Sequence, residues 1–224
     1  MRELEVRDLG RMEYSRAWEL QKELSERRKR GEIRDQLLFV EHPHVLTLGR
    51  NGHMENLLAS REHLAEMGID LVEIDRGGDI TYHGPGQIVG YPIIDLREWK
   101  KDVVAYVRGL EDVVIRTLRA FGIESGRDPS AAGVWVEGAK ICAIGVHISR
   151  WVTTHGFALN WKTELKYFNY IVPCGLTRPV TSMWKLGARV ERPAVLHVLL
   201  DAFAEGFEYK MARLTAPAGK VSGL

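Results

Sequence analysis

The sequence predicts an α+β fold in which helices pack on a mixed, largely antiparallel sheet. Three strand-like segments follow one another at 134–136, 141–149 and 153–159, with short turns at Gly138 and near Trp151. Neighbouring strands joined by such turns pair antiparallel, whereas a doubly wound parallel sheet needs a crossover between strands. A long segment at 102–121 carries apolar residues at helical spacing instead, which predicts a helix against that sheet.

The first half of the chain alternates strands and helices. Strands are expected at 4–8, 36–41, 45–48 and 70–74, and helices at 12–30 and 60–67. Gly31 ends the first helix, while Ser60 caps the second and Gly68 stops it. A further strand is expected at 88–96. It contains Pro92, which cannot donate to a ladder and so predicts an edge strand or a bulge.

The second half holds the clearest helix and the meander. The helix at 102–121 is expected to face the core through Val103, Val107, Leu110, Val114, Leu118 and Phe121. A last helix is expected at about 194–209. No linker separates two units, so we expect one domain over residues 1–214 and a tail at 215–224, where glycine, alanine and serine show no apolar period.

Composition excludes several classes of function. The 224 residues are 45% hydrophobic and 27% charged, which is ordinary for a globular protein. The net charge of +1 offers no general attraction for nucleic acid, and the basic run Arg27–Arg30 is more typical of a solvated helix end. No apolar run has the length of a membrane span, and the N-terminus lacks a signal peptide, so a cytoplasmic location is expected.

The chain has two cysteines, Cys142 and Cys174, and a cytoplasmic setting argues against a disulfide between them. Cys142 lies in the apolar strand Ile141–Gly145, where a cysteine packs as a small hydrophobic residue. Cys174 stands between Pro173 and Gly175, which favours an exposed turn and a nucleophilic role over burial. Lys140 opens the strand of Cys142. It either extends to water or lies in a cleft, where it would favour a thiolate and carry protons.

A glycine-rich block extends from Arg76 to Gln87 and contains four glycines and a proline. Such a backbone can approach a ligand closely, although a tight hairpin would show the same residues. The spacing is neither Gly-x-Gly-x-x-Gly nor a phosphate loop, so no nucleotide cofactor is predicted. His42 and His44 form a His-x-His pair, but no third ligand follows at metal-site spacing, and no metal is expected.

Taken together, these stretches resemble the lipoyl(octanoyl) transferases, which move an octanoyl group from acyl carrier protein to a lysine of lipoyl domains. The resemblance covers nearly the whole chain, and its order and spacing are specific. It rests on residues 41–50, 76–87, 138–145, 150–160 and 171–176. It implies the fold shared by biotin and lipoate protein ligases, and an acyltransferase that needs no cofactor.

The resemblance also implies roles for residues of this sequence. Cys174 matches the nucleophile of the family and Lys140 matches the lysine paired with it, with His83 or His155 as rival bases. The donor would be octanoyl acyl carrier protein. The acceptors would be lipoyl domains of 2-oxoacid dehydrogenases and the glycine cleavage H protein. Substrate contacts are expected from Arg76, Gly77, Gly78, Asp79, Ile80, Thr81, Tyr82, His83, Ala143, Ile144, Gly145, Gly156, Phe157 and Ala158.

Two other functions remain open at this point. An ATP-dependent lipoate or biotin ligase of the same fold would bind an adenylate and form no cysteine intermediate. A non-catalytic module would only hold an acyl carrier or a lipoyl domain. Cys174 argues against the ligase, and dependence on a nucleotide separates the two enzymes.

Overall fold

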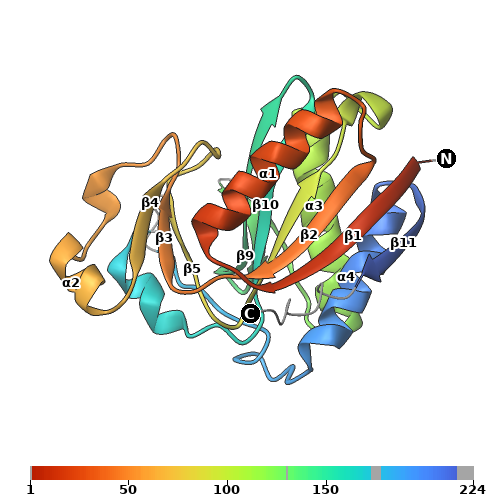
Figure 1. Cartoon of the computed structure of the whole chain (residues 1–224). Helices are drawn as coiled ribbons and strands as arrows, with labels where there is room; N and C mark the ends of the chain where they lie inside the picture. Colours follow the sequence, from red (N-terminus) through yellow and green to blue (C-terminus); the bar gives the residue numbers. More distant parts are fainter. Residues whose placement is uncertain (1, 130, 173–177, 216–224) are drawn as a thin grey trace, which may run out of the picture.

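A large sheet forms the centre of the computed structural model, which describes residues 2–129, 131–172 and 178–215 (Figure 1). The sheet has eight strands in the order β11-β1-β2-β6-β10-β9-β8-β7. They are β1 (Arg2–Arg11), β2 (Asp35–Glu41), β6 (Gln87–Ile93), β7 (Gly126–Asp128), β8 (Ala131–Val136), β9 (Ala139–Ser149), β10 (Val152–Asn160) and β11 (Tyr209–Thr215). Strand β1 pairs parallel with β2 and β11, and the other neighbours pair antiparallel. The predicted fold class is confirmed.

A second, three-stranded sheet lies beside the first, on the left in Figure 1. Its order is β4 (Asp70–Glu73), β3 (Val45–Leu48), β5 (Ile80–His83), and α2 (Arg61–Glu66) precedes β4. Short 3-10 helices lie at Met54–Asn56, Leu96–Glu98 and Leu165–Tyr170. Tyr82 of β5 packs with Tyr167 and Phe168, which gives this sheet an apolar cluster of its own.

Helices cover both faces of the large sheet (Figure 1). On one face α1 (Tyr14–Lys29) packs Leu24 against Leu38 of β2. On the other face α3 (Val103–Ala120) and α4 (Arg192–Gly206) bury Leu110 and Phe203. Alternate strand residues point to opposite faces, so one sheet serves two apolar clusters.

Helix caps and turns follow the sequence closely. The side chain of Ser60 accepts a hydrogen bond from the backbone N–H of His63, and that of Asp102 accepts one from Ala105. The β8–β9 turn at 137–138 and the β9–β10 turn at 150–151 each place two residues at positive φ. Two-residue turns of this kind match the twist of the strands they join. The predicted antiparallel meander is confirmed.

Three local predictions were wrong. Of the two alternatives predicted for Pro92, the edge strand is wrong, because β6 lies between β2 and β10. Its pairing with β10 ends at Gly90, so Pro92 stands where that ladder has opened. Val103 is 45% exposed because it begins α3, one turn before the buried stripe. The last helix ends at Gly206, and Tyr209 already belongs to β11.

The domain limits remain a prediction, although Thr215, expected to begin the tail, ends strand β11. Residues 216–224 lie outside the described part of the chain. Within that part, no helix combines the length and apolarity needed to span a membrane.

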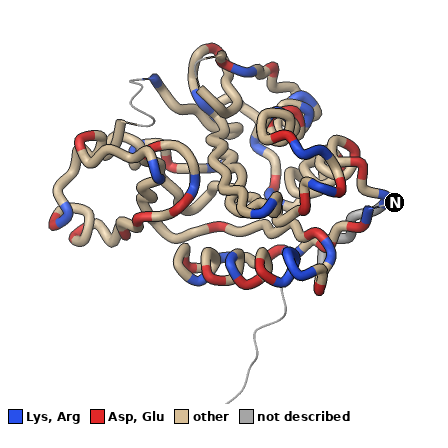
Figure 2. The backbone as a smooth tube through the Cα atoms, turned by 90° about the horizontal axis from the view of Figure 1, so that it is seen from above, with Lys and Arg blue, Asp and Glu red and all other residues tan. Residues whose placement is uncertain are grey.

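Acidic and basic residues are interleaved along α1 and over the rest of the described chain (Figure 2). In the basic run at 27–30, Arg28 is buried and its Nε donates to Asp35 Oδ1 at 2.7 Å. Lys29 pairs with Glu26 at 2.7 Å on the surface. The run therefore stabilises the contact between α1 and the sheet and is matched by carboxylates.

Candidate active site

A pocket lies between the α1 face of the large sheet and strand β5 of the small one. Its space, counted with the opening to solvent, is about 740 Å³. Strand β6 contributes Gln87, Val89 and Tyr91, which alternate along the strand and so share one face. Strands β9 and β10 contribute small and apolar residues, among them Ala143, Ile144, Gly145, Gly156, Phe157 and Ala158. The walls therefore suit an apolar ligand.

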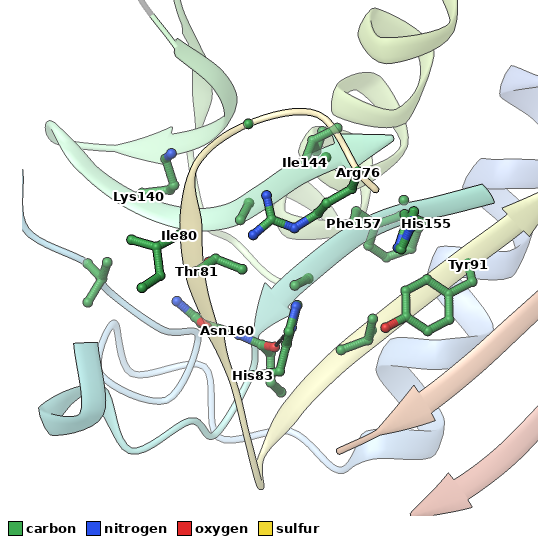
Figure 3. A pocket seen from close by; sticks show the side chains of 18 of the residues that line it. Arg76, Ile80, Thr81, His83, Tyr91, Lys140, Ile144, His155, Phe157 and Asn160 are labelled. Atoms are coloured by element: carbon green, nitrogen blue, oxygen red, sulfur yellow. Dashed lines mark hydrogen bonds between the residues drawn. The ribbon is translucent and has the colours of Figure 1, made fainter. Parts of the chain in front are cut away.

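The pairing of the strands shows which residues lie at each end of the pocket. At one end Gln87 is the register partner of Asn160, and Lys140 begins β9 nearby. At the other end lie Tyr91 and His155. Figure 3 shows Lys140 and Tyr91 at opposite ends, with Arg76, Thr81 and Phe157 between them. The site is thus an elongated channel with a cation at one end.

Residues 76–79, which we call the glycine strap, cross over the channel (Figure 3). The backbone N–H of Gly77 donates to the carbonyl of Val146 on β9 at 3.0 Å. Arg76 donates through Nη2 to the carbonyl and hydroxyl oxygens of Thr47 at 2.9 and 3.0 Å. A Cβ on Gly145 would lie 3.1 Å from Arg76 Cδ and from the Gly77 carbonyl oxygen. Glycine at 145 therefore lets the strap rest on β9.

Most of the residues expected to contact substrate meet at this channel. They are Arg76, Gly78, Ile80, Thr81, His83, Ala143, Ile144, Gly145, Gly156, Phe157 and Ala158. Their role in binding stays a prediction, but the structure brings their three separate stretches together. The glycine-rich block is not only a loop, since Ile80–His83 form β5.

Three expected contact residues face elsewhere. Gly77 donates its backbone N–H to the carbonyl of Val146 and does not line the channel, so its contact with substrate stays a prediction. Asp79 accepts from the N–H of His53 and Ile80 and from the side-chain amide of Asn56, and so fixes the base of the strap. Tyr82 points into the core of the small sheet, with its hydroxyl 2.8 Å from His44 Nδ1.

Lys140 lies at the end of the channel away from Tyr91 and is largely buried, with 7% of the residue exposed. Its Nζ stands 4.7 Å from the centre of the Trp135 ring, an arrangement that stabilises a cation. Of the two alternatives for Lys140, the structure shows the position in a cleft, and its role there stays a prediction. Cys174, expected to be its partner, lies outside the described residues.

Cys142 is fully buried in the core beneath the channel. Burial raises the pKa of its thiol well above the usual range, because the charged thiolate is poorly solvated there. Its predicted packing as a small hydrophobic residue is confirmed.

Two histidines line the channel, and each is held by a neighbour. His83 Nδ1 lies 2.8 Å from Gln87 Oε1, which makes Nδ1 the donor, and burial lowers the pKa of His83 well below its usual value. His155 Nε2 lies 2.9 Å from Asp75 Oδ1. Burial lowers the pKa of His155, although Asp75 opposes that shift. Both rings face the channel and remain candidates for a proton acceptor.

The two histidines of the His-x-His pair, His42 and His44, have separate partners. His42 Nδ1 donates to the carbonyl of Met12 at 2.7 Å, and the His44 ring packs at a tilt against Tyr167 with ring centres 4.2 Å apart. Among the described residues, no group of three or more histidine, cysteine, aspartate or glutamate side chains is placed to hold a metal ion.

Sequence reasoning missed several residues that line the channel: Tyr14, Gln87, Val89, Tyr91, Asn160, Phe168 and Val180. The alternation of Gln87, Val89 and Tyr91 along one strand was readable, but the face that they occupy depends on which strands flank β6. Tyr14 comes from the start of α1, more than 60 positions before the glycine-rich block. No local pattern connects it to the site.

We expect Cys142→Ala to retain most of the activity. The thiol is buried and uncharged, so the change removes only a small buried atom, at a cost of about 1 kcal/mol in stability. Steady-state transfer rates and thermal unfolding of the variant and wild type test this. A loss of activity without a loss of stability would contradict the structural role of Cys142.

The protein is expected to lose stability in mild acid. Burial lowers the pKa of His42 to about 4, below the ordinary value of 6.5, so the unfolded chain binds the extra proton first. Stability from His42 is thus complete above pH 6.5 and falls as the pH drops towards 4, by about 2–3 kcal/mol. Denaturant unfolding at pH 7.5 and 4.5 tests this. His42→Gln should flatten the dependence, and the exposed control His197→Gln should not.

Known proteins with similar sequences are enzymes of lipoyl and octanoyl transfer. Residues 13–204 match the lipoyl protein ligase A/B catalytic domain. An octanoyltransferase of Solibacter usitatus is 58% identical over 211 residues, covering 94% of this chain and 96% of that protein. An octanoyltransferase of Koribacter versatilis is 50% identical over 92% of this chain and 84% of its own length.

Solved structures confirm the predicted ligase-like fold. A bi-partite lipoate protein ligase of Thermoplasma acidophilum superposes with a TM-score of 0.78 over 96% of this chain and 88% of that one, at 17% identity. The biotin protein ligase of Aquifex aeolicus gives 0.53 over 93% and 70%, at 11% identity. At such identities the likeness concerns the fold alone. The family match and the identity to the two bacterial enzymes show that the chain belongs to the lipoyl protein ligase A/B catalytic domain family and, within it, to the octanoyltransferases.

Proposed function

We propose that this chain transfers an octanoyl group from octanoyl acyl carrier protein to a lysine of lipoyl domains, through a thioester on Cys174. The observation that carries the proposal is the channel, which has a buried lysine at one end and walls suited to an acyl chain. We infer that the acyl group is octanoyl because the similar bacterial proteins are octanoyltransferases.

The backbone around Lys140 supports its pairing with Cys174. The N–H of Lys140 donates to the carbonyl of Pro179 at 2.9 Å, and its carbonyl accepts from Thr181 at 3.0 Å. On the other side of the cysteine, Val172 donates to the carbonyl of Asn56 at 2.8 Å. Phe168, which precedes Cys174 in the sequence, and Val180, which follows it, both line the channel.

The first half-reaction forms the acyl-enzyme. The Cys174 thiolate, favoured by the charge of Lys140, attacks the carbonyl carbon of the octanoyl thioester. The tetrahedral intermediate collapses and the bond to the carrier's sulfur breaks. The carrier thiolate that leaves then takes up a proton. One thioester replaces another, so the step needs no nucleotide. The octanoyl chain lies between Val89 of β6 and Ile80 of β5, away from water.

The second half-reaction gives the product. The uncharged amine of the acceptor lysine attacks the acyl-enzyme carbonyl and loses a proton, and the Cys174 thiolate leaves. An amide forms. Lys140 is the proposed proton carrier in both halves. The donor protein binds and leaves before the acceptor domain binds at the same end of the channel, so the kinetics are ping-pong.

The proposed acceptors are lipoyl domains of 2-oxoacid dehydrogenases and the glycine cleavage H protein, and the proposed location is the cytoplasm. One structural neighbour was described together with its E2 lipoyl domain, which fits an acceptor of this type. Incubation with octanoyl acyl carrier protein and a lipoyl domain, without nucleotide, tests the proposal. Amide formation on the domain supports it. Strict dependence on ATP would favour a ligase, and no transfer under either condition would favour a binding module.

A further inference from the structure

We infer that Tyr14, Tyr91 and His155 form a rigid end wall that limits the length of the acyl chain. The inference rests on the proposed function, because it takes the channel as the place of the acyl group. Tyr91 and His155 lie at the end of the channel opposite Lys140 (Figure 3), and Tyr14 lines the channel beside His155. They come from α1, β6 and β10, so three elements must be in place to build the wall.

The length of the channel suits a medium chain. Gln87, at the level of Lys140, and Tyr91 are four residues apart on β6, which corresponds to about 13 Å. An extended eight-carbon chain spans about 9 Å, from C–C bonds of about 1.5 Å at tetrahedral angles. That span includes the carbonyl carbon, and the remainder accommodates the thioester sulfur beside Lys140. Each further pair of carbons adds about 2.5 Å and brings the terminal methyl against the Tyr91 ring.

Tyr91 is held firmly enough to act as a stop. His42 Nδ1 donates to the Met12 carbonyl at 2.7 Å, so its Nε2 accepts from the Tyr91 hydroxyl at 2.8 Å. The ring is 3% exposed and packs in the α1 cluster. Rotating it away from an incoming chain breaks this buried hydrogen bond, which leaves His42 Nε2 unpaired and is costly.

Tyr14 and His155 complete the wall and support one another. The Tyr14 ring stacks on His83 with centres 5.7 Å apart, and its hydroxyl lies 3.4 Å from His155 Nδ1. His155 donates its backbone N–H to Gln21 Oε1 at 2.7 Å and lies within reach of Asp75. Its φ of 56° is unusual for histidine, and such a conformation persists only where the surroundings fix it.

A fixed wall converts chain length into affinity. Each methylene that fits between the apolar side walls gains about 0.8 kcal/mol, roughly fourfold in binding. The first methylene that does not fit must displace a hydrogen-bonded ring. Affinity should therefore rise up to the limit and drop beyond it, which is a sharper selection than the side walls alone provide.

Transfer from acyl carrier protein thioesters of six to fourteen carbons tests the inference. In Tyr91→Leu the shorter side chain opens the wall, and we expect kcat/KM for dodecanoyl relative to octanoyl to rise at least tenfold. Tyr14→Leu should act in the same direction. Tyr91→Phe keeps the ring but loses the hydrogen bond to His42, so the length limit should relax less than in Tyr91→Leu. Tyr106→Leu, a fully buried tyrosine outside the channel, controls for general destabilisation and should leave the chain-length profile unchanged.

The outcomes separate the inference from the function on which it rests. If the wild type does not transfer octanoyl, the proposed function fails. If it does, equal use of octanoyl and dodecanoyl donors by the wild type overturns the inference. An unchanged profile in whichever of Tyr91→Leu and Tyr14→Leu folds, as judged by circular dichroism and thermal unfolding, also overturns it. Should neither fold, the wild-type profile decides.

Discussion

Cys174→Ala is expected to abolish octanoyl transfer, with a loss of about 10⁴-fold or more and no loss of stability. Alanine offers no nucleophile, and direct attack of the acceptor amine on the carrier thioester lacks the covalent route that divides the reaction into two steps. Single-turnover transfer to a lipoyl domain measures the effect. Thermal unfolding of the same preparation serves as the control for folding.

The matched control for this variant is Cys142→Ala. Both substitutions remove one thiol, but only the first removes the proposed nucleophile. A Cys174→Ala enzyme that transfers octanoyl at a tenth of the wild-type rate or better would mean that the acyl group does not pass through Cys174. The channel would then have to bring donor and acceptor together in one complex.

Lys140→Ala is expected to slow acylation by roughly two to four orders of magnitude, the range for a lost acid–base group. It should also raise the pH at which iodoacetamide labels Cys174, because the thiolate loses a neighbouring cation. Stopped-flow release of the carrier thiol measures the first effect, and a pH series of labelling measures the second.

Lys140→Arg separates the two roles of the lysine. Arginine keeps the charge but stays protonated, so labelling of Cys174 should remain close to wild type while turnover stays low. Near-normal turnover and labelling in Lys140→Ala would contradict the pairing. His83 and His155, which both line the channel, would then be the leading candidates for the base.

Sequence reasoning succeeded where local chemistry decides the structure. Ser60 caps a helix, and the turns at Gly138 and Trp151 join antiparallel strands, because each depends on a few neighbouring residues. It failed for β11, which pairs with β1 from the far end of the chain. The position of Pro92 likewise depends on which strands flank β6.

The candidate site shows the same division. The glycine-rich block and Lys140 were recognisable by resemblance, and the structure brings them to one channel. The sequence could not predict that the side chains of Asp79 and Tyr82 point away from the channel, because their partners Asn56 and His44 belong to other segments. The end wall was missed for the same reason, since Tyr14, Tyr91 and His155 meet only in the folded chain.

The central claim is an octanoyl thioester on Cys174, and intact mass spectrometry tests it most directly. The wild-type protein is mixed with octanoyl acyl carrier protein in the absence of acceptor, then mapped by peptide digestion at a pH that preserves thioesters. We predict one octanoyl group per chain, carried by Cys174, released when a lipoyl domain is added and absent from Cys174→Ala. An adduct on Cys142 or Lys140, or an unmodified enzyme that nevertheless transfers octanoyl, would contradict the account.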